Sequence, residues 1–339
     1  MPALTRPSRP SSRRFSTLRK LVTGCALGLV CAALVASPKA QADENENASA
    51  AFEGEEEEIG TWRFKHADKP VKVLILAGSV GAWQKGPYPE HIQNMCANVE
   101  VKNLSKTGYG AYQLRQRFMA QVVKNGYINL RKEGYEHWLV FQGGLNSIAT
   151  PERTNRELRQ MFLSAHKRGM KVVAFTPMPW GAESDKRWRG YSGLKYKDFT
   201  ETVKEFILGS ATPQRALGVY RDRRDDPTGP WLPEEIADVP INLYDSDMRD
   251  KMATPRDVEK MKALLAKDKD WKKSVAELSE DERAAKLEAD AQAAALIPQY
   301  FMRQELHAFD HIHPNEDGHR LIAETACPEL PRSWGCDCP

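Results

Sequence analysis

Residues 71–82 read VKVLILAGSVGA, an apolar run that ends on small residues around Ser79. A short, nearly continuous apolar run bounded by glycine is typical of a strand buried on both faces of a parallel sheet. Ligands gather at the carboxyl ends of such strands, so the Ser79 hydroxyl would stand where reactions occur. A serine after a strand is also a common helix cap, and this segment alone does not distinguish the two.

The chain beyond this segment alternates between strand-like and helix-like patterns. Further strands are predicted at Val99–Leu104, Trp138–Gln142 and Lys171–Thr176, with a weaker one at Pro240–Tyr244. Residues 110–124 and 152–168 carry apolar side chains at helical spacing. This alternation predicts an α/β fold in which a mainly parallel sheet is covered by helices on both faces.

Two more polar segments follow predicted strands. Gly108 lies in NLSKTGYG (103–110), where a glycine can direct a backbone N–H into a cleft or simply make a turn. Asn146 lies in FQGGLNS (141–147), where its amide can donate to an oxyanion, or form an Asx-turn or helix cap. Both positions are candidates for stabilising developing negative charge.

A fourth segment, DHIHPNEDGH at 310–319, precedes a helical pattern at Arg320–Ala326. Asp310 stands three residues before His313. A carboxylate at this spacing in a turn can accept a hydrogen bond from one ring nitrogen and leave the other free as a base. Four such segments in this order favour one catalytic site over four unrelated turns.

Together the four segments resemble the SGNH hydrolases, the GDSL-like esterases and lipases named for Ser, Gly, Asn and His in four blocks. Those positions are Ser79, Gly108, Asn146 and His313 here. The resemblance implies a three-layer α/β/α sandwich of flavodoxin-like type, a Ser79/His313/Asp310 triad, and neither metal nor cofactor. It also implies an oxyanion hole made by the backbone N–H groups of Ser79 and Gly108 and the Asn146 amide.

The sequence departs from the family pattern in two places. Ala77-Gly78-Ser79 replaces the usual Gly-Asp-Ser, and Ser147 replaces the Asp that often follows the asparagine. The resemblance spans residues 71–326. We expect one hydrolase-like domain at 67–330, with insertions at about 211–238 and 246–305 and a cysteine-rich tail at 331–339.

The second insertion is strongly helical and charged. Two helices are predicted to begin at Thr254-Pro255-x-Asp257 and Ser279-x-x-Glu282, where an oxygen-bearing side chain is followed by a carboxylate three residues later. Residues 254–295 would form either a lid or wall over the site, or a solvated face.

The first 42 residues resemble a signal peptide. They hold seven of the 49 basic and none of the 46 acidic residues, an apolar run at Leu21–Ser37 and a cleavage site at Ala40-Gln41-Ala42. A membrane anchor is the alternative, although the run is short for a spanning helix. Residues 43–66 are predicted to be a flexible acidic leader. We therefore expect a periplasmic or secreted protein without a stable membrane span.

The mature chain would carry a formal charge of −4, which argues against nucleic acid as a partner. Four cysteines would remain after cleavage: Cys96, Cys327, Cys336 and Cys338. An even number in an oxidising compartment predicts disulfides, whose pairing the sequence does not fix. A metal site at Cys336 and Cys338 is the alternative, but two ligands are too few.

The predicted function is an exported serine esterase acting on a small ester or an acylated glycan. One alternative is a metal-dependent hydrolase, because six possible ligands crowd one segment, although Pro314 would interrupt a helix that aligned them. These six are His307, Asp310, His311, His313, Asp317 and His319. A second alternative is a non-catalytic binding module. Four aromatic residues could serve binding or merely pack the insertions: Trp180, Trp188, Tyr191 and Trp231.

Overall fold

The computed structural model describes residues 71–124, 134–218 and 229–339, which all belong to one unit of the chain, Glu58–Pro339. The predicted signal peptide (1–42) and acidic leader (43–66) lie outside the described residues. Within the described residues, no helix is both long and apolar enough to cross a membrane.

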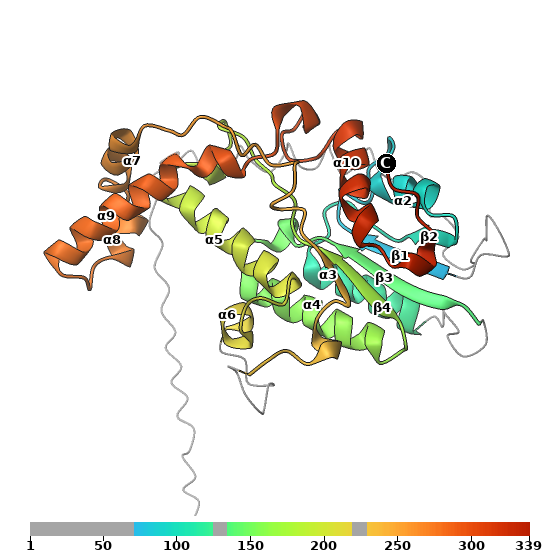
Figure 1. Ribbon diagram of the computed structural model, residues 1–339. Helices are drawn as coiled ribbons and strands as arrows, with labels where there is room; N and C mark the ends of the chain where they lie inside the picture. The colour runs from blue at the N-terminus through green and yellow to red at the C-terminus, as the bar shows by residue number, and fades with distance from the viewer. Residues whose placement is uncertain (1–70, 125–133, 219–228) are drawn as a thin grey trace, which may run out of the picture. The chain divides into compact units, whose positions relative to one another are not determined.

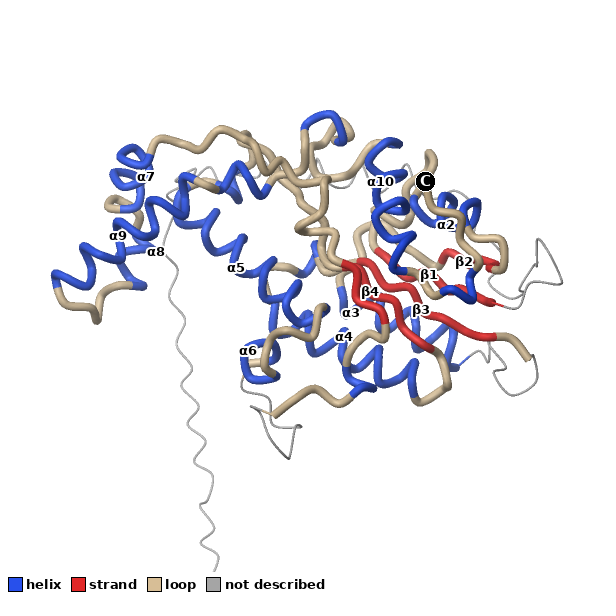
Figure 2. Tube along the Cα trace, viewed as in Figure 1, coloured by secondary structure: helices blue, strands red, loops and turns tan. Residues whose placement is uncertain are grey.

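Five parallel strands form one sheet in the order β2-β1-β3-β4-β5 (Figure 2). Their bounds are β1 (Val71–Ala77), β2 (Val99–Asn103), β3 (Glu136–Gln142), β4 (Lys171–Phe175) and β5 (Val239–Ile241). The chain leaves β1 for β2 on one side and later returns to β3 on the other side. Loops after β1 and β3 therefore separate at the carboxyl edge, where open α/β sheets bind their ligands.

The fifth strand ends earlier than its predicted end at Tyr244. Pro240 has no N–H to donate, which suits a short strand at the edge of the sheet. Beyond it, the backbone N–H groups of Leu243 and Tyr244 donate to the Thr176 hydroxyl at 2.9 and 3.0 Å. A side chain thus takes the place of the strand ladder there.

Side chains of β1 alternate between two hydrophobic cores. Leu74 and Leu76 belong to one core, whereas Val73 and Ile75 belong to the other, and all four are fully buried. Helices α3 to α6 cover the first face, and α2 and α10 cover the second (Figure 1). Their bounds are α2 (Tyr88–Met95), α3 (Ala111–Phe118), α4 (Pro151–His166), α5 (Gly190–Ile207), α6 (Pro213–Leu217) and α10 (Glu316–Ala326). The predicted three-layer α/β/α sandwich is confirmed.

The first insertion packs onto this sandwich. The Arg159 guanidinium of α4 donates to Glu235 at 2.5 and 2.9 Å, and both side chains are buried. Asn155 of α4 donates to backbone oxygens in α5 and α6. Residues 219–228 of the predicted insertion lie outside the described residues.

The second insertion contains three helices with a small core of their own. These are α7 (Val258–Leu265), α8 (Lys269–Ser274) and α9 (Glu280–Ala295), drawn at the left of Figure 1. Their core contains Leu265 and Trp271, whose indole N–H donates to Asp290 at 2.9 Å. Because the three helices bury apolar side chains against one another, part of their stability is local to the insertion.

One of the two predicted helix starts is confirmed and the other is wrong. Ser279 and Glu282 form a capping box at the start of α9. Helix α7 does not begin at Thr254; its cap is Asp257, which accepts from the Lys260 N–H at 2.7 Å. Asp257 directly precedes the first helical residue, so its carboxylate can accept from the N–H of Lys260. Thr254 lies one turn too early to do so.

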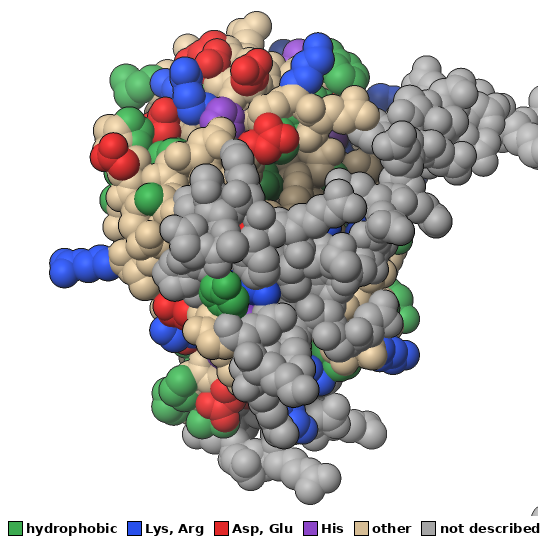
Figure 3. Space-filling view, turned by 90° about the vertical axis from the view of Figure 1, so that its right-hand side faces the viewer, with side chains coloured by type: hydrophobic (Ala, Val, Ile, Leu, Met, Phe, Trp, Pro, Cys, Tyr) green, Lys and Arg blue, Asp and Glu red, His purple; other side chains and the backbone are tan. Residues whose placement is uncertain are grey.

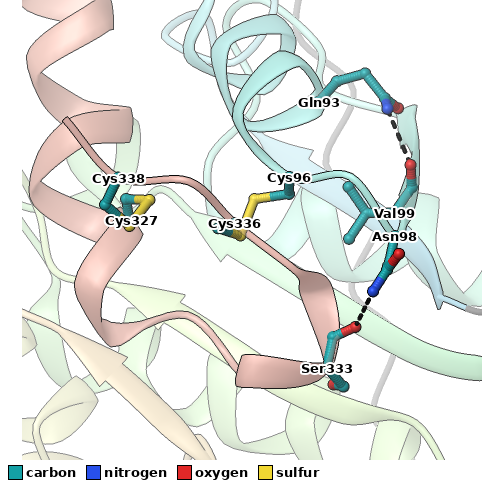
Figure 4. The surroundings of a disulfide bond; sticks show 8 residues. All are labelled: Gln93, Cys96, Asn98, Val99, Cys327, Ser333, Cys336 and Cys338. Atoms are coloured by element: carbon teal, nitrogen blue, oxygen red, sulfur yellow. Dashed lines mark hydrogen bonds between the residues drawn. A yellow bond between two sulfur atoms is a disulfide. The ribbon is translucent and has the colours of Figure 1, made fainter.

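Two disulfides hold the C-terminal tail (Figure 4): Cys96–Cys336 joins it to the end of α2, and Cys327–Cys338 joins it to the end of α10. This pairing was open in the sequence. Trp334 of the tail is fully buried, and its backbone oxygen accepts from the Asn98 N–H at 3.0 Å. The tail therefore takes part in the second core and extends the folded domain to its C-terminal end.

The exposed surface on the β2 side of the sheet carries mixed charge. Figure 3 shows this face, which lies to the right in Figure 1, with acidic and basic side chains interspersed over the described part.

Candidate active site

Ser79 lies in a turn directly after β1. The turn is closed by the Ala82 N–H, which donates to the Gly78 oxygen at 3.2 Å. Helix α2 begins only at Tyr88, with Pro87 as its cap, so Ser79 does not cap a helix. Its hydroxyl oxygen lies 2.6 Å from His313 Nε2, although 234 residues separate the two along the chain.

Asp310 and His313 share a loop just before α10. Asp310 Oδ1 accepts the N–H groups of Ile312 and His313 at 3.0 and 2.9 Å, and its Oδ2 contacts His313 Nδ1. Burial opposes ionisation of Asp310, but these bonds from His313 and Ile312 outweigh it and lower its pKa to about 2. The loop includes His311 at φ 56°, a left-handed conformation that costs a non-glycine residue about 1 kcal/mol or more.

The ionised Asp310 decides the tautomer of His313. A carboxylate can only accept hydrogen bonds, so the proton of the neutral imidazole lies on Nδ1. The lone pair on Nε2 is then free to accept the proton of the Ser79 hydroxyl. This arrangement makes Ser79 a candidate nucleophile and His313 a candidate general base.

Asn146 lines the same cavity as Ser79. One N–H of its amide donates to the Tyr109 oxygen at 3.2 Å, which leaves the second N–H available for a ligand. A Cβ added to Gly78 would lie 3.3 Å from the Tyr109 oxygen and 3.5 Å from Asn146 Nδ2. The glycine that departs from the family pattern therefore leaves room for these two groups next to the residue that precedes Ser79.

Gly108 has a φ of 77° and lies in a turn one residue before Tyr109. Tyr109 lines the cavity beside Ser79, whereas Gly108 is not among its lining residues. Ser147, the second departure from the family pattern, accepts from the Ala111 N–H at 3.2 Å and from the Thr154 hydroxyl at 2.9 Å. It therefore joins the starts of α3 and α4.

The cavity at Ser79 is small, at about 120 Å³. Trp180 and Arg187, which follow β4, form part of its wall. The Arg187 guanidinium lies 4.6 Å from the centre of the Trp180 ring and is paired with Asp185 at 2.7 Å. Sequence reasoning missed Arg187; its position beyond the carboxyl end of a predicted strand was the available signal.

A column of aromatic rings leads from the core to His313. Trp83 is stacked on the His313 ring, with 5.2 Å between centroids and 23° between planes. Trp83 also contacts His319 at 5.9 Å, and His319 stacks on Tyr88. Burial, with His313 and His91 nearby, lowers the pKa of His319 to about 3, so this ring is neutral at physiological pH. Trp83 was not singled out from the sequence.

The residues considered as metal ligands lie in different surroundings. His307 Nε2 bonds the Met302 oxygen at 2.9 Å, Asp317 pairs with Arg320, and His319 is fully buried. Among the described residues, no group of three His, Cys, Asp or Glu side chains could hold a metal ion.

The four aromatic residues considered for binding mostly pack the fold. Trp188 is fully buried against Trp180, Tyr191 packs against the core of α7 to α9, and Trp231 packs against Phe206. Of the four, Trp180 lines the cavity at the serine.

No protein-family model matches the chain, and no curated protein matches its sequence. Several solved structures are similar to it. A member of the lipolytic G-D-S-L family from Veillonella parvula has 13% identity, covers 76% of this chain and 96% of its own, and gives a TM-score of 0.42. A GDSL-like lipase from Bacteroides thetaiotaomicron has 12% identity, coverage of 84% and 92%, and a TM-score of 0.41. An acetyl xylan esterase variant from Geobacillus stearothermophilus has 12% identity, coverage of 80% and 97%, and a TM-score of 0.39.

Proposed function

We propose that this protein is an exported serine esterase of the SGNH hydrolase type, with Ser79, His313 and Asp310 as its catalytic triad. The observation that carries the proposal is the 2.6 Å contact between Ser79 Oγ and His313 Nε2, on an imidazole whose other nitrogen is held by an ionised carboxylate. This is the arrangement that activates a serine hydroxyl for attack on a carbonyl.

In the first half of the reaction, Ser79 Oγ attacks the ester carbonyl carbon while its proton passes to His313 Nε2. Asp310 stabilises the imidazolium that forms. The tetrahedral intermediate then breaks its bond to the alcohol oxygen, which takes the proton from His313. The products of this half-reaction are the free alcohol and an acyl group on Ser79.

Negative charge on the carbonyl oxygen needs donors during both halves. We assign this role to the backbone N–H of Ser79 and the free N–H of Asn146, each worth on the order of 3 kcal/mol in the barrier. The resemblance adds the backbone N–H of Gly108, which would have to approach the oxyanion from outside the lining of this cavity. In the second half, water gives a proton to His313 as it attacks the acyl carbon. The acid leaves and Ser79 recovers its proton.

The size of the cavity suits a short acyl group. Its volume of about 120 Å³ is well below the roughly 300–1,000 Å³ of usual ligand pockets. We therefore favour acetyl or a similarly small acyl group, with the alcohol part of the ester outside this cavity. Two disulfides support a location outside the cytoplasm, where an O-acetylated glycan is a natural substrate.

The proposal is tested with purified protein, 4-nitrophenyl acetate and a fluorophosphonate probe. Ser79→Ala should lower kcat by about 10⁴-fold or more and abolish labelling by the probe, while circular dichroism shows an unchanged fold. Turnover retained in Ser79→Ala would refute the assigned nucleophile. Activity that a chelator removes would instead favour the metal-dependent alternative, and a folded wild type without labelling would favour a non-catalytic binding protein.

A further inference from the structure

A second, larger cavity adjoins the one at Ser79. It has a volume of about 560 Å³ and is lined by Gly181 and His311 among others. Their chain neighbours Trp180 and Ile312 line the serine cavity. The two cavities therefore lie beside each other at two stretches of backbone, one after β4 and one in the loop that carries Asp310 and His313.

The second insertion builds most of this larger cavity, which we call the insertion cleft. Its wall includes residues 250 and 253–256 before α7, and residues 298, 301, 302 and 304 after α9. The helices themselves pack on their own core, while the segments that lead into and out of them face the catalytic loop. A volume of about 560 Å³ lies in the usual range for a ligand pocket, unlike the serine cavity.

The lining of the cleft mixes apolar side chains such as Phe301 with polar and charged ones, and its strongest cation is already neutralised. The Arg256 guanidinium pairs with Glu183 at 2.7 Å and donates to the Trp188 oxygen at 3.1 Å. Asp250 adds a further carboxylate to the wall. An anionic ligand would find no free arginine among these lining residues and would be repelled by the acids. A long acyl chain would remove the Arg256–Glu183 pair and the Asp250 carboxylate from water, which is costly.

His307 adds a neutral ring to the wall of the cleft. Its Nε2 lies 2.9 Å from the Met302 carbonyl oxygen, which can only accept, so the ring proton lies on Nε2. Its Nδ1 is then a buried lone pair, and no described residue donates to it. Burial, followed by the neighbouring histidine, lowers the pKa of His307 despite the bond to Met302, which keeps the ring neutral.

We propose that the insertion cleft binds the alcohol part of the ester and that this part is a neutral, polyhydroxylated chain such as an oligosaccharide. The proposal rests on the proposed esterase function. Hydroxyl groups can donate to Asp250 and accept from the amide of Gln304. Phe309, which is 87% exposed two residues before His311, adds a ring on which the apolar face of a sugar could stack.

The first test compares two tryptophan substitutions in the same insertion. Thr254→Trp places a large ring at an exposed position in the cleft wall, whereas Ala285→Trp places it at an exposed position of α9 outside the cleft. For each variant, kcat/KM is measured on a partially O-acetylated neutral oligosaccharide and on 4-nitrophenyl acetate. We expect the oligosaccharide-to-aryl ratio to fall about 10-fold or more in Thr254→Trp and to remain unchanged in Ala285→Trp.

An equal ratio in the two variants would overturn the cleft proposal. It would not affect the proposed esterase function as long as hydrolysis of the aryl ester still depended on Ser79. Loss of all Ser79-dependent hydrolysis in the wild type would instead refute the function itself.

The second test measures binding without turnover. A neutral, deacetylated hexasaccharide is titrated into Ser79→Ala protein by calorimetry, and the titration is repeated with Gln304→Ala in the same background. Saturable binding that weakens at least about 5-fold in the double variant supports the proposal. Absence of binding, or equal binding by both proteins, contradicts it even if a tryptophan variant misfolds. Tighter binding of a uronic-acid oligomer or a decyl chain would assign the cleft to another ligand class.

Discussion

The carboxyl edge of the sheet, which carries the candidate site, and the inserted helices α7 to α9 are held together in different ways. At the sheet edge, Ser79 meets His313 across 234 residues of chain, and Asn146 comes from a third loop. In the insertion, the helices are stabilised by caps such as Ser279 and by a compact local core. The site therefore depends on the whole sandwich, whereas the insertion depends largely on its own core, against which α5 also packs.

This contrast suggests different roles for the two regions. Bond cleavage is assigned to groups fixed by the sheet, and recognition of the larger part of the substrate to segments at the base of the insertion. Substitutions at the sheet edge should reduce turnover of every ester, and substitutions within the inserted core should leave a small ester almost unaffected.

The largest effect expected in this series is that of Asp310→Asn. An amide cannot hold the same tautomer of His313, so kcat on 4-nitrophenyl acetate should fall about 1,000-fold or more. Asp317→Asn, an exposed carboxylate in α10, is the control and should change kcat less than twofold. Because the pKa of Asp310 is lowered to about 2, this carboxylate stays ionised above pH 4. A loss of activity between pH 8 and pH 4 must therefore come from the protonation of another group. A small effect of Asp310→Asn would remove it from the triad.

Asn146→Ala should slow the same reaction by about 100-fold, because one donor to the developing oxyanion is lost. The expected change lies in kcat, with little change in KM, and is measured by steady-state kinetics. Asn98→Ala, which removes an amide near the tail, is the matched control. An unchanged kcat would show that the amide only holds Tyr109.

Trp83→Leu should lower kcat/KM by up to about 10-fold, since an aromatic face stabilises a cation stacked on it. If this ring stabilises the imidazolium, its loss also shifts the acidic limb of the pH profile to lower pH. The other ionisable groups around His313 are Asp310, His319 and the cavity residue Arg187. Trp83→Phe should restore most of the rate. A lower rate with an unshifted limb would indicate packing alone.

The smallest effect on activity is expected from Leu265→Ala, in the core of the insertion. Removing this buried side chain should destabilise α7 to α9 by about 3 kcal/mol, seen as faster hydrogen exchange in α9. Turnover of 4-nitrophenyl acetate should nevertheless stay within about twofold of the wild type. Leu139→Ala in β3 makes the same truncation in the sheet core and should lower overall stability and turnover together. Equal loss of activity in both variants would break the contrast between the two regions.

Most strands were readable from sequence because they contain a short apolar run, as at Val71–Ala77, whereas β2 (VEVKN) alternates apolar and polar residues. Helix α2 was missed since it is only eight residues long and begins on Tyr88-Pro89. The start of α7 was misplaced because Thr254-Pro255 resembles a cap as closely as Asp257 does. Local patterns of this kind compete, and packing selects among them.

The candidate site could likewise be predicted only in part from the sequence. Spacing within one loop was sufficient to predict that Asp310 would face His313. Three other features involve residues from separate elements that share no motif. These are the stacking of Trp83 on the imidazole, the wall formed by Arg187 and Trp180, and the cleft beside His311. No local pattern could have related them.

The sequence by itself determined the strand–helix alternation, the four polar segments at strand ends and before the last helix, and the even number of cysteines available for disulfides. Only the tertiary structure decided the pairing of Cys96 with Cys336, the 2.6 Å approach of His313 to Ser79, and the cleft at the base of the insertion. The physical reason is range. Strand and cap patterns depend on residues that are close together in the sequence. The contacts named above join segments that are far apart in the sequence, and these segments come together only when both faces of the sheet are buried.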